Sequence, residues 1–243
     1  MRTLIISDIH ANLTALEAVL SDAEPFDRVW SLGDVVGYGP DPEDCINRLR
    51  DLSNLQCIKG NHDAAVSGDI PLDAFNYSAQ RALIWMTENI SEENLNWLRG
   101  MSEMEVIDEI TLVHGSPRWP FWEYITDVSI ARENMDKFDT KVCLVGHTHF
   151  PSVFEMDDTD ISSTSFLIKK NNEPFFLEEK CIVNPGSVGQ PRDHNPKASY
   201  LIYDDQDDTW CYHRVGYDIL QVQNRIIAAG LPRRQADRLS QGW

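Results

Sequence analysis

Five separate segments of the chain share one pattern, in which a short apolar run of β-strand character stops at side chains that bind cations. The segments are residues 4–10 with Asp8 and His10, 29–34 with Asp34, 55–62 with Asn61 and His62, 110–114 with His114, and 142–149 with His147 and His149. Strands that feed helices build open α/β sheets, whose ligands bind at the carboxyl ends of the strands. The pattern therefore predicts an α/β protein with a polar site at one sheet edge.

The N-terminal residues predict a parallel sheet. Strand-like runs at residues 2–7, 28–32 and 55–59 alternate with helical segments. One helix is expected over residues 13–21, and another opens at Asp41, followed by proline and acidic residues as helix starts often are. A β-α-β-α-β series of this kind indicates a parallel core.

The rest of the chain predicts a helical cover, a second sheet and a helical tail. The cover is expected over residues 75–100, and the tail over residues 217–241 with a break at 230–232. A second, more antiparallel sheet is expected over residues 152–215. Its short strands are predicted at 152–156, 164–168, 174–177, 180–184, 199–204 and 209–215. No repeat or linker divides the chain, so we expect one domain over residues 1–243.

The composition limits the class of partner. A formal net charge of -18 repels long nucleic acid and anionic membranes, so an anionic substrate must be attracted locally. The pair Arg233-Arg234 is too short to count as a basic cluster. The five cysteines include no C-x-x-C pair, and the N-terminal apolar run is too short for a signal peptide. No window approaches the roughly 18 apolar residues of a membrane span, and we expect a cytoplasmic protein.

The histidines are concentrated in the strand-end segments. Of seven in the chain, only His194 and His213 lie outside them. A single histidine is more often a satisfied polar residue than a ligand. Five at equivalent positions, interleaved with Asp8, Asp34 and Asn61, need a common explanation because buried polar groups without partners are costly. A bound cation supplies one, and the sequence predicts a metal site.

The number of candidate ligands favours two ions that share a carboxylate. Seven protein ligands are too many for one ion that must keep a position open for water. Two ions about 3.5–4 Å apart clamp both the attacking and the leaving oxygen of an in-line displacement. Mixed imidazole and carboxylate ligands favour manganese, iron, cobalt, nickel or zinc over magnesium or calcium. Two dications would also make the site locally positive, so that an anionic phosphoester can bind there.

In combination, these motifs resemble the calcineurin-like metallophosphoesterase superfamily. The matching blocks, in order, are Asp8-x-His10, Gly33-Asp34, Gly60-Asn61-His62-Asp63, His114 and Gly146-His147-x-His149. Residues 33–40, 114–117 and 184–192 are similar to the small bacterial and archaeal phosphodiesterases and phosphatases of that superfamily. The resemblance implies an α/β fold, a four-layer αββα sandwich of two mixed β-sheets flanked by helices.

The resemblance also implies roles for individual residues. One metal would be held by Asp8, His10, His149 and a bridging Asp34, and the other by Asp34, Asn61, His114 and His147. Manganese is the first choice, followed by iron, zinc, nickel or cobalt. A metal-bridging hydroxide would attack phosphorus, and His62 would contact the phosphoryl oxygen or protonate the leaving group. Asp63 would either orient the ring of His62 or cap the turn.

Three further features remain open between a functional and a structural interpretation. Asn12 is either a helix N-cap or a substrate contact. Arg192 is either a phosphate contact, for which its planar fork is suited, or an exposed loop residue. The aromatic residues of the loop at 119–124 either pack on the body of the protein or form the wall of a pocket.

The sequence favours a dinuclear metal-dependent phosphoesterase that hydrolyses small phosphodiesters, phosphomonoesters or dinucleoside polyphosphates. A non-catalytic interaction module is the first alternative, although such relatives usually lack a ligand or the histidine that corresponds to His62. A nuclease or a protein phosphatase is the second alternative, and the absence of a basic track for a nucleic-acid backbone argues against the nuclease. The sequence does not indicate an oligomeric state.

Overall fold

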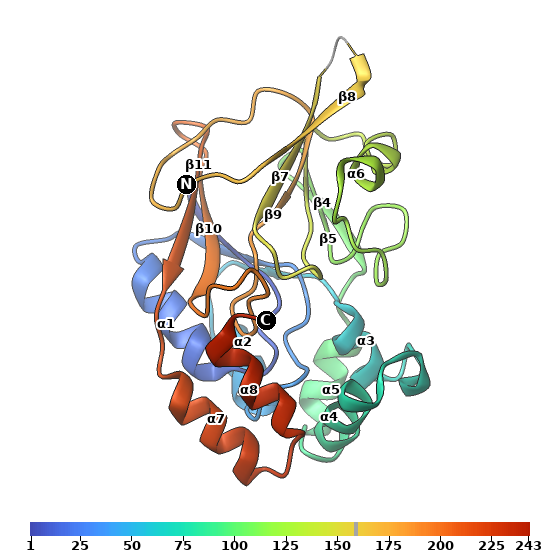
Figure 1. The fold of residues 1–243 in the computed structure, drawn as a ribbon, viewed down its shortest axis with the longest axis vertical. Helices are drawn as coiled ribbons and strands as arrows, with labels where there is room; N and C mark the ends of the chain where they lie inside the picture. Colours follow the sequence, from blue (N-terminus) through green and yellow to red (C-terminus); the bar gives the residue numbers. More distant parts are fainter. Residues whose placement is uncertain (158–159) are drawn as a thin grey trace.

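A computed structural model of the chain describes residues 1–157 and 160–243. In this part of the chain the strands form two sheets, with helices on their outer faces (Figure 1). The first sheet contains β1 (Arg2–Ile6), β2 (Arg28–Ser31), β3 (Leu55–Cys57), β10 (Ala198–Asp204) and β11 (Thr209–Val215). The second contains β4 (Met104–Ile107), β5 (Ile110–Val113), β6 (Val142–Leu144), β7 (Ser152–Asp157), β8 (Asp160–Leu167) and β9 (Cys181–Asn184). The helices are α1 (Leu13–Ala23), α2 (Pro42–Arg50), α3 (Asn61–Ser67), the 3₁₀ turn η1 (Leu72–Ala74), α4 (Tyr77–Glu88), α5 (Glu92–Arg99), α6 (Val128–Asn134), α7 (Ile219–Ala228) and α8 (Arg233–Gln241).

Both sheets are mixed. The first has the strand order β11-β10-β1-β2-β3, with β1, β2 and β3 parallel and β10 antiparallel to β1. The second has the order β4-β5-β6-β9-β7-β8, with β5, β6 and β9 parallel. Each sheet therefore has three parallel strands whose carboxyl ends lie at one edge.

Side-chain alternation along the strands accounts for the layers. In β1, Leu4 and Ile6 pack against α1 and α2, whereas Ile5 between them packs against the second sheet. In β9, Ile182 faces α6, and its neighbour Val183 faces the first sheet. Strands with apolar residues on both faces are buried between two other layers. The α/β fold expected from the sequence, two mixed sheets flanked by helices, is confirmed.

The helices begin where capping side chains occur. Asn12, Asn76, Ser91 and Asp127 each accept a hydrogen bond from a backbone N–H in the first turn of α1, α4, α5 and α6. Helices α4 and α5 pack beside α3 as the expected cover, and α7 packs against α8 at the end of the chain. In the described residues, no helix is both long and apolar enough to cross a membrane.

Two expectations about the strands were wrong. The strands at 199–204 and 209–215, expected in the second sheet, belong to the first, because β10 pairs with β1 through Ile5 and Leu201. The alternation of apolar and polar residues identifies a strand, but it does not show which other strand pairs with it. Residues 174–177 form no strand and make only an isolated bridge between Phe175 and Trp210. Pro174 has no N–H to continue a ladder from that bridge.

Candidate metal centre

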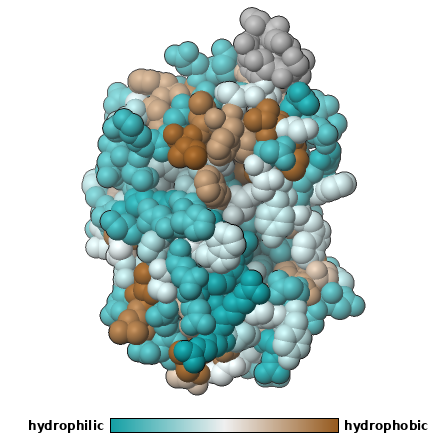
Figure 2. Space-filling model, in the orientation of Figure 1, coloured by the Kyte–Doolittle hydropathy of each residue, from teal (hydrophilic) through white to brown (hydrophobic). Residues whose placement is uncertain are grey.

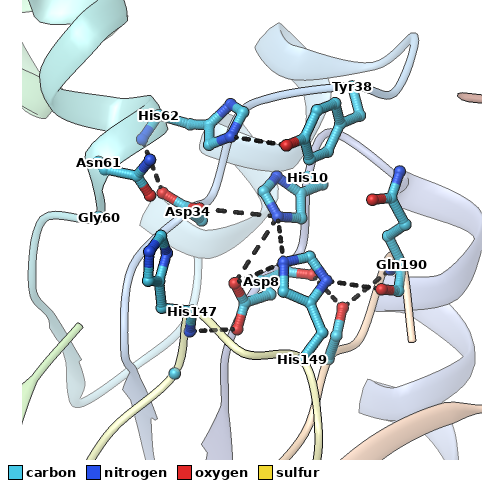
Figure 3. A network of polar contacts seen from close by, with 12 residues as sticks. Asp8, His10, Asp34, Tyr38, Gly60, Asn61, His62, His147, His149 and Gln190 are labelled. Carbon is cyan, nitrogen blue, oxygen red and sulfur yellow. Dashed lines mark hydrogen bonds and ion pairs between the residues drawn. The ribbon is translucent and has the colours of Figure 1, made fainter. Parts of the chain in front are cut away.

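The five strand-end segments meet in one buried cluster. Figure 3 shows the side chains of Asp8, His10, Asp34, Asn61, His147 and His149 gathered there. Loops after β1 and β2 carry three of the predicted ligands, the start of α3 carries one, and loops after β5 and β6 carry three. All seven side chains are at most 3% exposed: Asp8, His10, Asp34, Asn61, His114, His147 and His149. Segments that lie up to about 140 residues apart in sequence thus contribute to a single site, as the carboxyl ends of parallel strands do.

Asp8, His10 and His149 form the first half of the cluster. The Nε2 atom of His149 lies 3.2 Å from Asp8 Oδ1 and 3.2 Å from His10 Nε2. The other ring nitrogens are occupied, because Nδ1 of His10 donates to the carbonyl of Val36 and Nδ1 of His149 to the carbonyl of Gln190. A carbonyl can only accept, so in the neutral rings both facing Nε2 atoms carry lone pairs. Two lone pairs at this distance repel each other, and a cation between them removes the repulsion.

Asp34, Asn61, His114 and His147 form the second half. His114 Nε2 lies 3.3 Å from Asp34 Oδ2 and 3.2 Å from Asn61 Oδ1, and its Nδ1 donates to the carbonyl of Leu32. His147 Nε2 is buried and has no hydrogen-bond partner among the described residues. Asp34 Oδ2 also lies 3.6 Å from His10 Nε2, so this carboxylate faces both halves.

The backbone of the ligand loops is strained. Asp8, His10, Asp34, His147 and His149 all have φ between 49° and 64°, in the left-handed region that non-glycine residues avoid. Such conformations persist only where the surrounding structure holds them, and they cluster at functional sites. Here each one turns a side chain at a strand end back into the cluster.

Glycine next to the ligands makes room for them. A Cβ atom at Gly60 would lie 2.1 Å from Asp34 Oδ1, and one at Gly37 would lie 2.6 Å from His10 Nδ1. Gly37 also has a φ of 117°, which side chains rarely permit. The sequence needs glycine at both positions to keep these ligands in place.

The electrostatics of the cluster favour an ionised carboxylate at Asp34 and neutral imidazoles at His147 and His149. Burial opposes ionisation of Asp34, but the charges of His114, His62 and His10 and the hydrogen bond to His114 together hold the pKa of Asp34 below its usual range. Burial also opposes protonation of His114, yet Asp34 raises the pKa of His114 to about 9. Burial lowers the pKa of His147 and His149 well below the usual value, so these imidazoles have the neutral form that binds metals.

The two residues of the proposed catalytic pair, His62 and Asp63, have different surroundings in the structure. His62 lies beside Asp34 and His10, and burial lowers the pKa of His62 to about 3. Asp63 accepts hydrogen bonds from the backbone N–H groups of Gly60 and Val36, at 3.0 Å each. Both carboxylate oxygens of Asp63 are therefore engaged by the turn. Of the two roles considered for Asp63, the structure favours the cap and places no hydrogen bond from it on the ring of His62.

The two predicted substrate contacts, Asn12 and Arg192, also differ in their surroundings. Asn12 accepts from the N–H of Ala15 and donates to the carbonyl of Gly189, so its amide holds the backbone as an N-cap would. Arg192 donates to Gln190 Oε1 at 3.4 Å, and its buried Nε has no partner among the described residues. Its charge acts on the rings of His62, His147 and His149. Arg192 thus lies beside the cluster, whereas the side-chain amide of Asn12 is engaged by the backbone.

Two tyrosines also contact the cluster, Tyr38, to which the sequence assigned no role, and Tyr124 of the aromatic loop. The hydroxyl of Tyr38 lies 3.1 Å from His62 Nε2, and its ring packs 4.6 Å from that of His10 (Figure 3). Tyr124 stacks on His147 with ring centroids 3.9 Å apart. Tyr38 entered the sequence prediction only as part of the family-like segment 33–40, although its place four residues after Asp34 was a usable signal. Tyr124, Trp119 and Trp122 remain between 41% and 60% exposed, so the aromatic loop borders the site and is not buried in the core.

The donor set fits divalent transition metals. Three groups of side chains hold possible ligand atoms within 4.8 Å of one another, and Asp34 belongs to two of them. Asp8 Oδ1 and His147 Nε2 are buried and have no hydrogen-bond partner in the described part of the chain, as expected for ligand atoms. The fold and this cluster together define the chain by class as a metal-binding hydrolase.

Comparison with known proteins gives the family. A model of the calcineurin-like phosphoesterase superfamily domain matches residues 1–208, and the chain belongs to this family of metal-dependent phosphoric ester hydrolases. It is 44% identical to a solved metallophosphoesterase from Sphaerobacter thermophilus, with a TM-score of 0.91 over 100% of this chain and 99% of that one. It is 36% identical to an uncharacterized protein of Methanocaldococcus jannaschii, over 98% of this chain and 97% of that protein.

A second group of relatives matches less of the chain. A symmetrical bis(5'-nucleosyl)-tetraphosphatase of Pectobacterium atrosepticum is 30% identical over 145 residues, which are 55% of this chain. The match spans 49% of that enzyme, about half its length. A hypothetical protein of Pyrococcus horikoshii, 23% identical with a TM-score of 0.79 over 100% of this chain and 98% of that one, shares the fold.

Proposed function

We propose that the chain is a dinuclear metal-dependent phosphoesterase that acts on small phosphodiesters, phosphomonoesters or dinucleoside polyphosphates. Asp8, His10 and His149 would hold one ion, and Asn61, His114 and His147 the other. The observation that carries the proposal is the position of Asp34, whose carboxylate faces both halves of the cluster. A shared carboxylate between two sets of nitrogen and oxygen donors is the arrangement expected for a pair of transition-metal ions, with Mn²⁺ the first choice.

In this proposal, the residues around the two ions would have different roles in the reaction. When bound, the two cations would supply Lewis acidity toward phosphoryl oxygen and make water more acidic. Arg192 would contact the phosphoryl oxygens through its planar fork. His62 would contact the phosphoryl group and give a proton to the leaving oxygen, since an anion beside the ring favours its protonated form. Tyr38 would hold the ring of His62 through Nε2.

The symmetrical tetraphosphatase relatives support dinucleoside polyphosphates as one substrate class. The aromatic rings around the cluster are consistent with a small substrate. Tyr124 of the loop at 119–124 stacks on His147. The ring centroid of Phe75 lies 5.0 Å from that of His62 and 5.1 Å from that of Trp122 in the same loop. Aromatic borders of this kind suit a base or a sugar phosphate.

The proposal is tested by a substrate panel on protein of known metal content. Bis-p-nitrophenyl phosphate, p-nitrophenyl phosphate and a dinucleoside tetraphosphate should be hydrolysed with Mn²⁺ and not after chelation. His62→Ala should keep its metal and lose about 10²-fold in kcat, the usual contribution of a proton donor. His213→Ala is the matched control, because His213 stacks on Tyr200 in the first sheet. Full activity of His62→Ala would remove this residue from the mechanism.

A further inference from the structure

A pocket of about 330 Å³ lies next to the cluster of candidate metal ligands, with Tyr38 between them. It is formed by the start of α4, one face of α8 and the turn that follows Asp34. The lining residues are Tyr38, Asn76, Tyr77, Ser78, Arg234, Gln235 and Arg238. Tyr38 connects the pocket to the cluster, because its hydroxyl bonds His62 and its ring packs on His10. A molecule held by the cluster could therefore extend past Tyr38 into this pocket.

Arg234 and Arg238 bring positive charge to the pocket, and among the described residues neither forms an ion pair with an acidic side chain. They lie one turn apart on α8, on the same face of the helix. Arg238 Nε donates to the main-chain oxygen of Trp243, and no aspartate or glutamate of the described residues pairs with either guanidinium. Figure 2 shows strongly hydrophilic side chains gathered over α8. In a chain of net charge -18, arginines without acidic partners beside a metal site suggest that an anion binds there.

Arg192 increases this positive charge from the side of the cluster. Burial, followed by the charge of Arg192, lowers the pKa of Arg238 to about 10, which leaves Arg238 protonated at neutral pH. The charge of Arg234 acts on Arg238 in the same sense. Arg192 and Arg234 therefore both repel the guanidinium of Arg238, and a bound anion would relieve that repulsion.

The helix that carries these arginines is fixed to the ligand loops. Gln235, which follows Arg234 on α8, is buried. Its Nε2 donates to Ser78 Oγ at 3.0 Å, and its Oε1 accepts from Gln190 Nε2 at 3.1 Å. The carbonyl of Gln190 in turn accepts from Nδ1 of the candidate ligand His149. The arginines are thus held in a set position relative to the cluster, as binding groups need to be.

We propose that this pocket is a second phosphate subsite, which binds another phosphate of a substrate whose first phosphate lies at the metal cluster. The ligand class is a phosphoanhydride chain, such as that of a nucleoside polyphosphate, and the inference rests on the proposed function. Arginine forks bind phosphate oxygens in pairs. The exposed ring of Tyr77 lies at the pocket wall, where it can contact the nucleoside beyond the phosphates.

The kinetic test compares two substrates of the Mn²⁺-loaded enzyme. We measure kcat/KM for a dinucleoside tetraphosphate and for bis-p-nitrophenyl phosphate, which has no second phosphate, and take their ratio. Arg234→Ala and Arg238→Ala should each lower this ratio about tenfold, mainly through KM, since each removes a charge-assisted contact. Arg233→Ala is the matched control, because Arg233 pairs with Asp237 and does not line the pocket. An unchanged ratio in both pocket variants would overturn the proposal.

A binding test separates the subsite from the proposed reaction. Inorganic tripolyphosphate is titrated calorimetrically into the full chain after metal removal, so that the readout does not depend on activity. The wild-type chain and Arg233→Ala should bind it, and Arg234→Ala/Arg238→Ala should bind about tenfold or more weakly. If no phosphoester is hydrolysed while this difference persists, the proposed function fails and the anion site stands. Equal affinity of the wild-type chain and the double variant would remove the site even from an active enzyme.

Discussion

The floor and the rim of the site are built in different ways. The floor, defined as the seven candidate metal ligands, is almost fully buried, and most of its backbone lies in strained left-handed conformations. The rim, defined as Tyr38, Tyr124, Arg192, Arg234 and Arg238, is assembled from a turn, an aromatic loop, a loop after β9 and a C-terminal helix. Each floor residue is held by the strand that precedes it, whereas the rim depends on tertiary packing.

This difference indicates a division of labour between chemistry and selectivity. A change in the floor should remove metal and with it all turnover. A change in the rim should leave the metal in place and alter which esters are hydrolysed, because rim residues reach the parts of a substrate away from the reacting phosphorus. Each prediction below tests one side of that division.

The largest effect is expected for Asp34→Asn. The amide keeps the shape of the carboxylate but removes the charge that faces both halves of the cluster. We expect both metals to be lost or weakened, and kcat/KM to fall at least about 10³-fold, or about 4 kcal/mol. Metal content by mass spectrometry and hydrolysis of bis-p-nitrophenyl phosphate measure the two effects. Asp136→Asn is the control, because the Asp136 carboxylate is exposed and pairs with its neighbour Lys137. Full metal content in Asp34→Asn would contradict the assignment of Asp34 to the floor.

The next effect tests the floor through its backbone. In Gly60→Ala the new Cβ would meet Asp34 Oδ1 at 2.1 Å and Asp34 N at 2.3 Å, so the carboxylate must shift. Displacing a group that positions a ligand typically costs about 10–100-fold in metal affinity, and we expect a loss in that range by metal titration. Gly216→Ala is the matched control, because nothing lies within 4 Å of a Cβ there. Wild-type affinity in Gly60→Ala would mean that the floor is less rigid than its geometry implies.

Tyr38→Phe tests the boundary between floor and rim. The substitution removes the hydroxyl that contacts His62 Nε2 and leaves the ring that packs on His10. A hydrogen bond of this kind contributes about 1 kcal/mol, so we expect kcat to fall about fivefold at constant metal content. Tyr203→Phe, which removes a hydroxyl bonded to the surface residue Asp208, should have no effect on kcat. Loss of metal in Tyr38→Phe would place Tyr38 in the floor.

The convergence of the floor residues could be predicted from the sequence because these residues follow strands of the two sheets. A run such as residues 4–6 identifies a buried strand, and the polar residues after it must lie at the sheet edge. The assignment of Asp8 or His114 to a shared site therefore needed only the knowledge that parallel strands end together. The side-chain tautomers and the strained backbone could not be read from the sequence, since they depend on carbonyls such as those of Val36 and Leu32.

The rim was poorly predicted because its residues are separated along the chain. Arg233-Arg234 was dismissed as too short a basic run, yet Arg234 and Arg238 lie together on α8 and approach Arg192 only in the folded protein. The pairing of β10 with β1 escaped prediction for the same reason. For Asn12 and Asp63 the sequence left a functional and a capping role open, and the choice depends on backbone groups that only the folded chain brings to them.

The smallest effect is expected in the aromatic loop, where Tyr124 and Trp119 differ in what they touch. Tyr124 stacks on His147, whereas Trp119 contacts the guanidinium of Arg118 and is 60% exposed. A stacked pair contributes about 0.5–1 kcal/mol beyond burial, so Tyr124→Ala should raise KM about threefold, and Trp119→Ala should leave it within about twofold of wild type. Michaelis curves for a dinucleoside tetraphosphate and p-nitrophenyl phosphate, at full metal occupancy, measure both. If Trp119→Ala had the larger effect, the rim would extend outward along the loop, and the substrate would be longer than the pocket beside α8 implies.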